Sequence, residues 1–231
     1  MQILIIDNNI DPDSWGASEL RTMAKFAADA TVYVRRAPAE DLPASPRGFD
    51  RIIVSGSKTS MEEAPWIDQL ESFVRRAVES GKPLLGICYG HQILARALGG
   101  KDMVRRASRY EYGWGKVEIT DPDSRLFQGL PRVFHTFQAH QDEVRELPKG
   151  MKLLARSEDC PIQACELVGR PVFGIQFHPE RPPTAGEASL SKKIKANPKA
   201  EYLNPGSGLK LFDRNIGETI FRNFFTLERQ T

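Results

Sequence analysis

The amino-terminal part of the sequence alternates short apolar runs with helical patterns. The runs predicted to be strands are Gln2 to Asp7, Thr31 to Arg35, Arg51 to Ser55 and Pro83 to Ile87. Helical periodicity is found over Ser14 to Ala28, Trp66 to Ser80 and Tyr89 to Leu98. This alternation is typical of βαβ units, which build a parallel sheet covered by helices. The sequence therefore predicts an α/β fold.

The sequence changes character after Lys101. Shorter runs predict further strands at Gly115 to Thr120, Val133 to Phe137, Lys152 to Arg156, Ile162 to Leu167 and Val172 to Phe177. We expect a meander of antiparallel and mixed strands here, closed by an amphipathic helix over Asp213 to Leu227. The segment of about 181–210 has little periodicity, which predicts an irregular insertion. Without an internal repeat or a second boundary, we interpret residues 1–231 as a single domain.

Composition and charge argue against several classes of protein. The 32 basic and 30 acidic side chains give a formal net charge of +2, so neither nucleic acid nor an anionic membrane is expected as a partner. The apolar run from Ile3 to Ile6 is far too short for a signal peptide or a membrane span. The three cysteines, Cys88, Cys160 and Cys165, are too few for a disulfide framework and lack metal-site spacing. We therefore expect a cytoplasmic protein without a metal ion or a cofactor.

Cys88 lies between two glycines, at the point where an apolar run ends and a helical pattern begins. The spacing Gly86-x-Cys88-x-Gly90 is the cysteine form of the nucleophile elbow, a turn so sharp that both flanking positions must be small. Such a turn exposes the sulfur at the carboxyl end of a strand, where open α/β sheets bind ligands. The positive end of the following helix would also favour a thiolate. We interpret Cys88 as a nucleophile.

A nucleophilic thiol needs a base, and His178 is the most informative of the four histidines. Pro179 biases His178 toward an extended conformation. In an extended chain, residues two apart face the same way, so Glu180 can lie beside the imidazole. The sequence therefore predicts a triad in which Glu180 orients His178 and His178 takes the proton of Cys88.

These two motifs and three further stretches resemble the class I (triad) glutamine amidotransferases, nearest to the amidotransferase domain of GMP synthetase. The supporting stretches are Val54-Ser55-Gly56-Ser57, Glu111-Tyr112-Gly113 and His140-Gln141-Asp142-Glu143-Val144, which follow the order used by that family. The similarity extends from Gln2 to Glu180. It implies a flavodoxin-like fold: a three-layer sandwich around a mostly parallel central sheet, with a smaller antiparallel sheet.

The resemblance also implies an activity and the residues that perform it. Family members hydrolyse glutamine to glutamate and ammonia through a γ-glutamyl thioester. Cys88 would be the nucleophile, His178 the base and then the acid, and Glu180 the orienting carboxylate. The oxyanion hole would use the backbone amides of Ser57 and Tyr89. The substrate-binding residues implied are Gly56, Gln92, Gln141 and Asp142.

Two departures from the family pattern leave the substrate open. GMP synthetases have glycine in place of Gln141, and the substitution resembles the γ-glutamyl peptidase branch. Gly56-Ser57-Lys58 replaces the usual Gly-Gly-Pro, and a side chain at Ser57 would restrict the peptide flip that builds the oxyanion hole. We favour a glutaminase that supplies ammonia to a separate synthetase. A stand-alone γ-glutamyl hydrolase or peptidase, and a catalytically silent regulatory module, stay open as alternatives.

Overall fold

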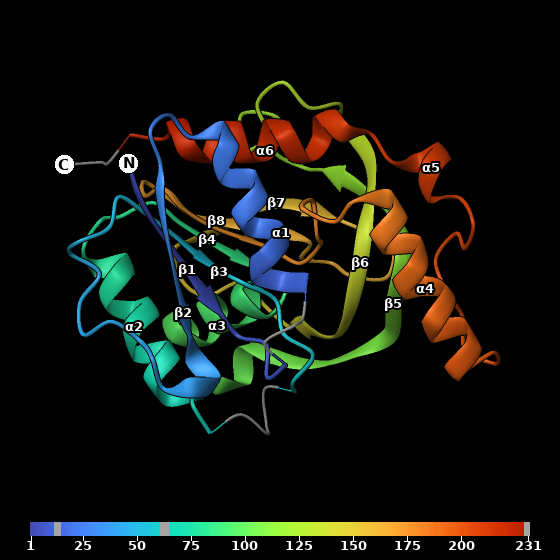
Figure 1. Cartoon of the computed structure of the whole chain (residues 1–231), viewed down its shortest axis with the longest axis horizontal. Coiled ribbons are helices and arrows are strands. Elements are labelled where there is room, and N and C mark those ends of the chain that lie inside the picture. Colours follow the sequence, from blue (N-terminus) through green and yellow to red (C-terminus); the bar gives the residue numbers. More distant parts are fainter. Residues whose placement is uncertain (12–14, 61–64, 229–231) are drawn as a thin grey trace.

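The computed structural model describes residues 1–11, 15–60 and 65–228. Across these ranges the strands form one nine-stranded sheet in the order β2-β1-β3-β4-β9-β8-β7-β5-β6 (Figure 1). The predicted α/β fold is therefore present. Ser14, with which the first predicted helix begins, lies outside the described residues.

One half of the sheet is parallel. It consists of β1 (Gln2–Asp7), β2 (Thr31–Arg36), β3 (Arg51–Val54), β4 (Leu84–Ile87) and β9 (Val172–Ile175). Every neighbouring pair among these five strands is parallel, from β2 to β9. Four of them lie where the alternating pattern places strands, and β4 at the centre carries Cys88 just beyond its carboxyl end.

The other half of the sheet is antiparallel. It consists of β5 (Val104–Ile119), β6 (Val133–Val144), β7 (Met151–Arg156) and β8 (Ala164–Leu167). The pairs β9·β8, β8·β7, β7·β5 and β5·β6 are all antiparallel. The expected smaller antiparallel sheet is thus not separate, because β8 pairs with β9 and continues the parallel half. Among the described strands the parallel and antiparallel pairings are equal in number, so the sheet is mixed rather than mostly parallel.

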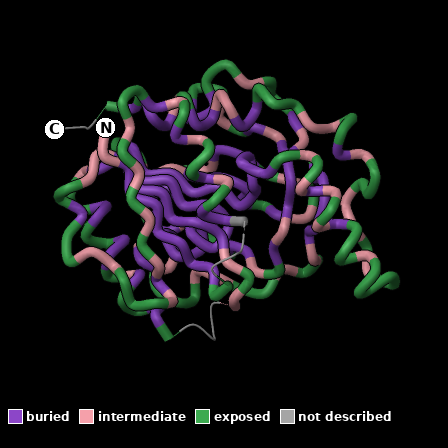
Figure 2. Tube along the Cα trace, in the orientation of Figure 1, coloured by how far each residue is buried: buried purple, intermediate pink, exposed green. Residues whose placement is uncertain are grey.

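Helices cover both faces of the parallel half, and alternation along the strands decides which core each residue joins. Ile3 and Ile5 pack with α1 (Trp15–Met23) and α6 (Arg214–Thr226). Leu4 and Ile6 face the opposite way and pack with α2 (Ile67–Glu79) and α3 (Tyr89–Gly99). In Figure 2 the strands β1, β3 and β4 between these layers are almost continuously buried, whereas the edge strand β2 alternates between exposed and half-buried residues. This arrangement fixes the carboxyl ends of β1, β3 and β4 firmly.

The segment 181–210, expected to be irregular, contains α4 (Pro183–Ala196) and α5 (Gly208–Leu211). Pro183 occupies the first position of α4, where the missing N–H of proline costs no hydrogen bond. The helix buries Leu190 against Trp114 and Phe137, beside the long strand β5 (Figure 1). Most of its other residues are exposed, so its sequence lacks the apolar stripe that would have predicted it.

The predicted closing helix is α6, whose first turn is capped by the Asp213 side chain accepting from the Asn215 amide at 2.9 Å. Short 3-10 helices complete the described elements: η1 (Ala24–Phe26), η2 (Ala37–Ala39) and η3 (Lys101–Met103). No helix within the described ranges has the length and apolar character needed to span a membrane.

Candidate functional site

Cys88 joins β4 to α3 through a strained turn. Its backbone has φ 52° and ψ −101°, a positive φ that non-glycine residues rarely adopt. A Cβ on Gly86 would lie 2.4 Å from the carbonyl oxygen of Gly90, and a Cβ on Gly90 would lie 2.1 Å from that of Val54. Both glycines are therefore required by close backbone approach, as the elbow spacing predicts.

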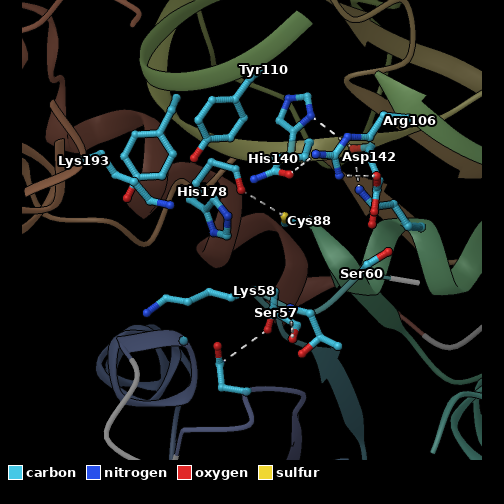
Figure 3. A pocket seen from close by; sticks show the side chains of 18 residues that line it. Ser57, Lys58, Ser60, Cys88, Arg106, Tyr110, His140, Asp142, His178 and Lys193 are labelled. Atoms are coloured by element: carbon cyan, nitrogen blue, oxygen red, sulfur yellow. Dashed lines mark hydrogen bonds and ion pairs between the residues drawn. The ribbon is translucent and has the colours of Figure 1, made fainter. Parts of the chain in front are cut away.

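His178 and Glu180 follow β9 and lie against the elbow. The His178 amide donates to the Phe137 carbonyl at 2.8 Å, which ties this segment to β6. The Nδ1 atom of His178 lies 2.8 Å from Oε1 of Glu180. On its other side the imidazole hydrogen-bonds the side chain of Cys88. The three predicted side chains are thus brought together, and each is at most 3% exposed. Figure 3 shows two of them, Cys88 and His178, at the cavity.

The electrostatics of this cluster favour a charged imidazole. Burial by itself lowers the pKa of His178, but the charges of Glu180 and Cys88, with their hydrogen bonds, raise that pKa to about 10. The cluster therefore favours a protonated imidazole at His178, in contact with the side chains of Cys88 and Glu180. A group of this kind can attack an electrophilic carbonyl carbon and then protonate a leaving nitrogen.

The loop after β3 forms the side of the site that faces the elbow. The carbonyl of Gly56 accepts hydrogen bonds from Oγ of Ser55 at 2.9 Å and from Nδ2 of Asn9 at 3.4 Å. Because a trans peptide holds its C=O and N–H on opposite sides, these donors place the Ser57 N–H away from Asn9. A Cβ on Gly56 would approach Cε1 of His178 to 2.9 Å, so the imidazole closely abuts this loop.

Tyr89, the second residue expected in an oxyanion hole, is the first residue of α3. Its amide belongs to the first turn of a helix, where N–H groups have no acceptor within the helix. The side chain is 1% exposed and packs with Ile93 and Leu94 in the core beneath α3. Tyr89 therefore presents its backbone, rather than its ring, toward the end of β4.

A cavity of about 420 Å³ opens above Cys88 and His178. Four predicted substrate-binding residues line it: Gly56, Gln92, Gln141 and Asp142. The side-chain amide of Gln92 donates from Nε2 to the backbone carbonyl of Asp142 at 2.7 Å and to Oε1 of Gln176 at 3.2 Å. The Gln92 side chain thus holds the carboxyl-terminal part of β6 against α3. Gln141 and Asp142 belong to this part of β6 and lie at the rim of the cavity.

Several further residues of the cavity wall were not predicted. They include Asn9, Arg106, Tyr110 and Lys193 (Figure 3 labels the last three). Asn9 follows the carboxyl end of β1, so the rule that ligands bind at this edge of a parallel sheet could have identified it. The others come from β5 and α4, which reach the cavity only through tertiary packing. Arg106 pairs with Asp142 at 3.4 Å and also contacts Gln141.

Glu111, His140 and Cys160 form a buried cluster beside the cavity, and their potential metal-ligating atoms lie within 4.8 Å of one another. Nε2 of His140 lies 2.9 Å from Oε2 of Glu111, which also accepts from the Gln163 amide at 3.2 Å. The register of β5 and β6 places Glu111 directly opposite His140. Cross-strand pairing therefore accounts for the contact between Glu111 and His140, and we assign no metal to the cluster.

The other two cysteines are poor nucleophiles. Burial raises the pKa of the Cys165 thiol to about 12. Burial, with the neighbouring carboxylates of Glu111 and Glu143, raises the pKa of the Cys160 thiol well above its usual value. Neither lines the cavity, so only Cys88 of the three combines access with a base.

Known proteins resemble this chain in sequence and in fold. The family model described as glutamine amidotransferase class-I matches residues 4–196. A glutamine-hydrolyzing GMP synthase subunit of Thermococcus kodakarensis is 40% identical over 161 residues, which cover 69% of this chain and 80% of that protein. The corresponding subunit of Methanocaldococcus jannaschii is 33% identical over 160 residues, covering 69% and 79%.

Solved structures with the same fold include a glutamine amidotransferase from Methylobacillus flagellatus. It has a TM-score of 0.81 at 23% identity, covering 100% of this chain and 96% of its own. A glutamine amidotransferase from Thermotoga maritima has a TM-score of 0.76 at 19% identity, covering 97% of this chain and 96% of its own. The family model spans most of the sequence, from β1 through α4. The chain therefore belongs to the class I glutamine amidotransferase family.

Proposed function

We propose that this protein hydrolyses L-glutamine to glutamate and ammonia through a thioester on Cys88, and supplies the ammonia to a separate synthetase. The observation that carries the proposal is the contact of His178 with both Cys88 and Glu180 at a strained elbow. The relatives described as subunits of a glutamine-hydrolyzing GMP synthase support the pairing with a synthetase.

The chemistry follows from the placement of the three side chains. The thiolate of Cys88 attacks the side-chain amide carbon of glutamine and forms a tetrahedral intermediate. The proton on His178 passes to the amide nitrogen, the C–N bond breaks, and ammonia leaves a γ-glutamyl thioester. His178 then takes a proton from water, whose oxygen attacks the thioester, and the C–S bond breaks to release glutamate. Glu180 orients the imidazole and stabilises its charged form throughout.

Two backbone amides would stabilise the oxyanion of each tetrahedral intermediate. We assign this role to the N–H groups of Ser57 and Tyr89. The hydrogen bonds from Ser55 and Asn9 to the Gly56 carbonyl hold the intervening peptide in one orientation. This support offers a way for Ser57 to serve in the hole although it is not glycine. Gly56, Gln92, Gln141 and Asp142 would line the path of the substrate.

The remaining expectations about context form part of the same proposal. We propose a single catalytic domain over residues 1–231, acting in the cytoplasm without a metal ion or cofactor. The three cysteines are unpaired, which suits a reducing compartment.

A γ-glutamyl hydrolase or peptidase is the second candidate, because Gln141 stands where the synthetase pattern has glycine. Its side chain is exposed at the cavity, where it contacts Arg106 and the Tyr110 side chain. It could therefore contact a leaving group larger than ammonia. The same Cys88 thioester would serve this reaction. A silent regulatory module is disfavoured, because such a role needs no nucleophile in contact with a base.

A side-by-side assay of the purified protein distinguishes these functions. Ammonia release from L-glutamine and amine release from γ-glutamyl peptides are measured at equal concentrations, with Cys88→Ala as the control. Preference for glutamine, increased by a candidate synthetase, supports the proposal. Preference for the peptides would replace it with the second candidate. Equal background rates in wild type and Cys88→Ala would support the catalytically silent regulatory module instead.

A further inference from the structure

Asn9 lies just beyond the carboxyl end of β1 and is held by residues of β1 and β2. Its backbone amide donates to Oδ1 of Asp7 at 3.1 Å, and its backbone carbonyl accepts from Nη2 of Arg36 at 2.8 Å. Asp7 is itself buried, and its Oδ2 atom lies 3.8 Å from Nε of Arg36. The main chain of Asn9 is therefore fixed at both its amide and its carbonyl.

The buried side chain of Asn9 is fixed as well. Its Nδ2 atom donates to Oδ1 of Asp7 at 2.8 Å. Because an ionised carboxylate only accepts hydrogen bonds, this contact settles which end of the carboxamide is the nitrogen. The same nitrogen also donates to the Gly56 carbonyl at 3.4 Å. A Cβ on Gly16 of α1 would lie 2.4 Å from Nδ2, so α1 closes another side of the carboxamide.

This series of contacts ends on the peptide that joins Gly56 to Ser57. The peptide carbonyl accepts from Asn9 and from Oγ of Ser55 at 2.9 Å, so the N–H of the trans peptide is directed the opposite way. A Cβ on Gly56 would lie 3.5 Å from the Cβ of Cys88, and Ser57 and Cys88 line the same cavity (Figure 3). Asn9 therefore acts on a peptide beside the reacting sulfur.

The side chain at position 57 favours the same orientation of this peptide. Ser57 is not one of the described residues other than glycine that have a positive φ. Turning the preceding peptide over would move φ of Ser57 into the positive range, which residues with a Cβ rarely adopt. The sterics of Ser57 and the hydrogen bond from Asn9 thus hold the N–H on one side.

We propose that Asn9 is a positioning residue for glutamine hydrolysis, which holds the peptide between Gly56 and Ser57 so that its N–H can donate to the oxyanion of each tetrahedral intermediate. The inference rests on the proposed function, because that function supplies the intermediates and assigns Ser57 to the oxyanion hole. Asn9 acts through this peptide and takes no part in making or breaking bonds. A donor fixed in advance needs no reorganisation during the reaction, which lowers the barrier.

The test compares Asn9→Ala with Asn223→Ala. Asn223 is the matched control because its side-chain amide also donates to backbone carbonyls, those of Leu126 and Gln128, and it does not line the cavity. We expect Asn9→Ala to lower kcat for L-glutamine about tenfold with KM changed less than about twofold, because the oxyanion exists only after attack. Asn223→Ala should match wild type in both constants.

Alkylation of Cys88 separates positioning from damage to the nucleophile. A thiolate displaces iodide from the saturated carbon of iodoacetamide, so the S–C bond forms as the C–I bond breaks and no oxyanion arises. The rate of labelling at Cys88, followed by mass spectrometry, should therefore be equal in wild type and Asn9→Ala. Parallel losses of labelling and turnover would show that Asn9 only supports the elbow, and would overturn the role. So would a kcat in Asn9→Ala that matches Asn223→Ala.

Gly16→Ala disturbs the same carboxamide without removing it. The new Cβ must displace Nδ2 of Asn9, and alanine suits a helix, so kcat should fall severalfold in a folded protein. Adding Gly16→Ala to Asn9→Ala should cost nothing further, because the displaced group is then absent. Losses that multiply in the double variant would show that the carboxamide is not the shared cause, and would overturn the role.

Failure of this role and failure of the proposed function give different results. If wild type releases ammonia from glutamine and Cys88→Ala does not, the proposed function stands, and the comparison of kcat with alkylation judges Asn9 alone. If wild type turns over neither glutamine nor a γ-glutamyl peptide, the proposed function is wrong and the role of Asn9 fails with it.

Discussion

The floor and the mouth of the cavity are built in different ways. At the floor, Cys88 lies at the end of the buried strand β4, and its backbone is confined by Gly86, Gly90 and Val54. At the mouth, exposed side chains such as Lys193 and Arg106 extend from the edge of the sheet and from α4. Backbone sterics thus fix the floor, and side-chain packing of distant elements shapes the mouth.

The difference suggests that the floor of the cavity carries out the reaction and that the mouth selects the substrate. Groups at the floor have no freedom to move without disturbing the central strands, which suits atoms that must keep a reactive geometry. Groups at the mouth can change without disturbing the core, which suits recognition of the rest of the substrate. Substitutions at the floor should therefore act on kcat or on folding, and substitutions at the mouth on KM.

The largest effect is expected for Cys88→Ala. Removal of the nucleophile should lower glutamine turnover by about 10⁴-fold or more, judged from comparable triads. A glutamine-derived electrophile such as diazo-oxo-norleucine should label wild-type protein at Cys88, as located by mass spectrometry. Cys160 and Cys165 serve as internal controls because both are buried with raised pKa values. Label on either of them instead would contradict the assignment of the floor.

The next effect separates the two partners of Cys88. His178→Asn should reduce kcat more than Glu180→Gln, because the imidazole transfers the proton and the carboxylate orients it. Glu180 also helps to raise the pKa of His178, so Glu180→Gln should shift the alkaline limit of the kcat profile to lower pH. Steady-state rates across pH for both variants test this order. Losses that are negligible in both would indicate a structural role for the pair.

Gly90→Ala tests the sterics of the floor by stability rather than by rate. The new Cβ would lie 2.1 Å from the Val54 carbonyl oxygen, so β3 or α3 must shift, at a cost of about 1–3 kcal/mol in unfolding free energy. Gly48→Ala is the matched control, because no atom lies within 4 Å of a Cβ there. Urea unfolding measures the unfolding free energy of the Gly90→Ala and Gly48→Ala variants. A Gly90→Ala protein as stable as the control would show that the elbow tolerates a side chain.

The same contrast explains what the sequence could predict. The elbow and the pair His178 and Glu180 follow from local rules, since glycine spacing and an extended X-Pro segment fix side-chain directions over a few residues. Helix α4 was missed because it buries little beyond Gly186 and Leu190. The first half of β5 was missed because its side chains are mostly exposed and polar. Tyr110 and Lys193 therefore reach the cavity through tertiary packing, which no short sequence motif predicts.

The smallest effect concerns Glu19, which joins the floor to the mouth. Glu19 lies on α1 and pairs with Arg181, whose side chain also contacts Ser189 on α4 and whose backbone directly follows Glu180. Burial, reinforced by the charge of Glu180 and opposed by Arg181, raises the pKa of Glu19 to about 7. Because this pKa is above the ordinary value of 4.5, the native state holds a proton that the unfolded state releases between these pH values.

The stability of wild type should therefore decrease, relative to Glu19→Gln, as pH rises from about 4.5 to about 7. We expect a change of about 1 kcal/mol, because part of the side chain reaches solvent and the full shift is screened. Urea unfolding of both proteins at pH 5 and pH 8 measures it, with Glu79→Gln as the control, since Glu79 is exposed on α2. If the difference between wild type and Glu19→Gln were the same at both pH values, Glu19 would stay charged throughout. The link between floor and mouth would then be a plain ion pair.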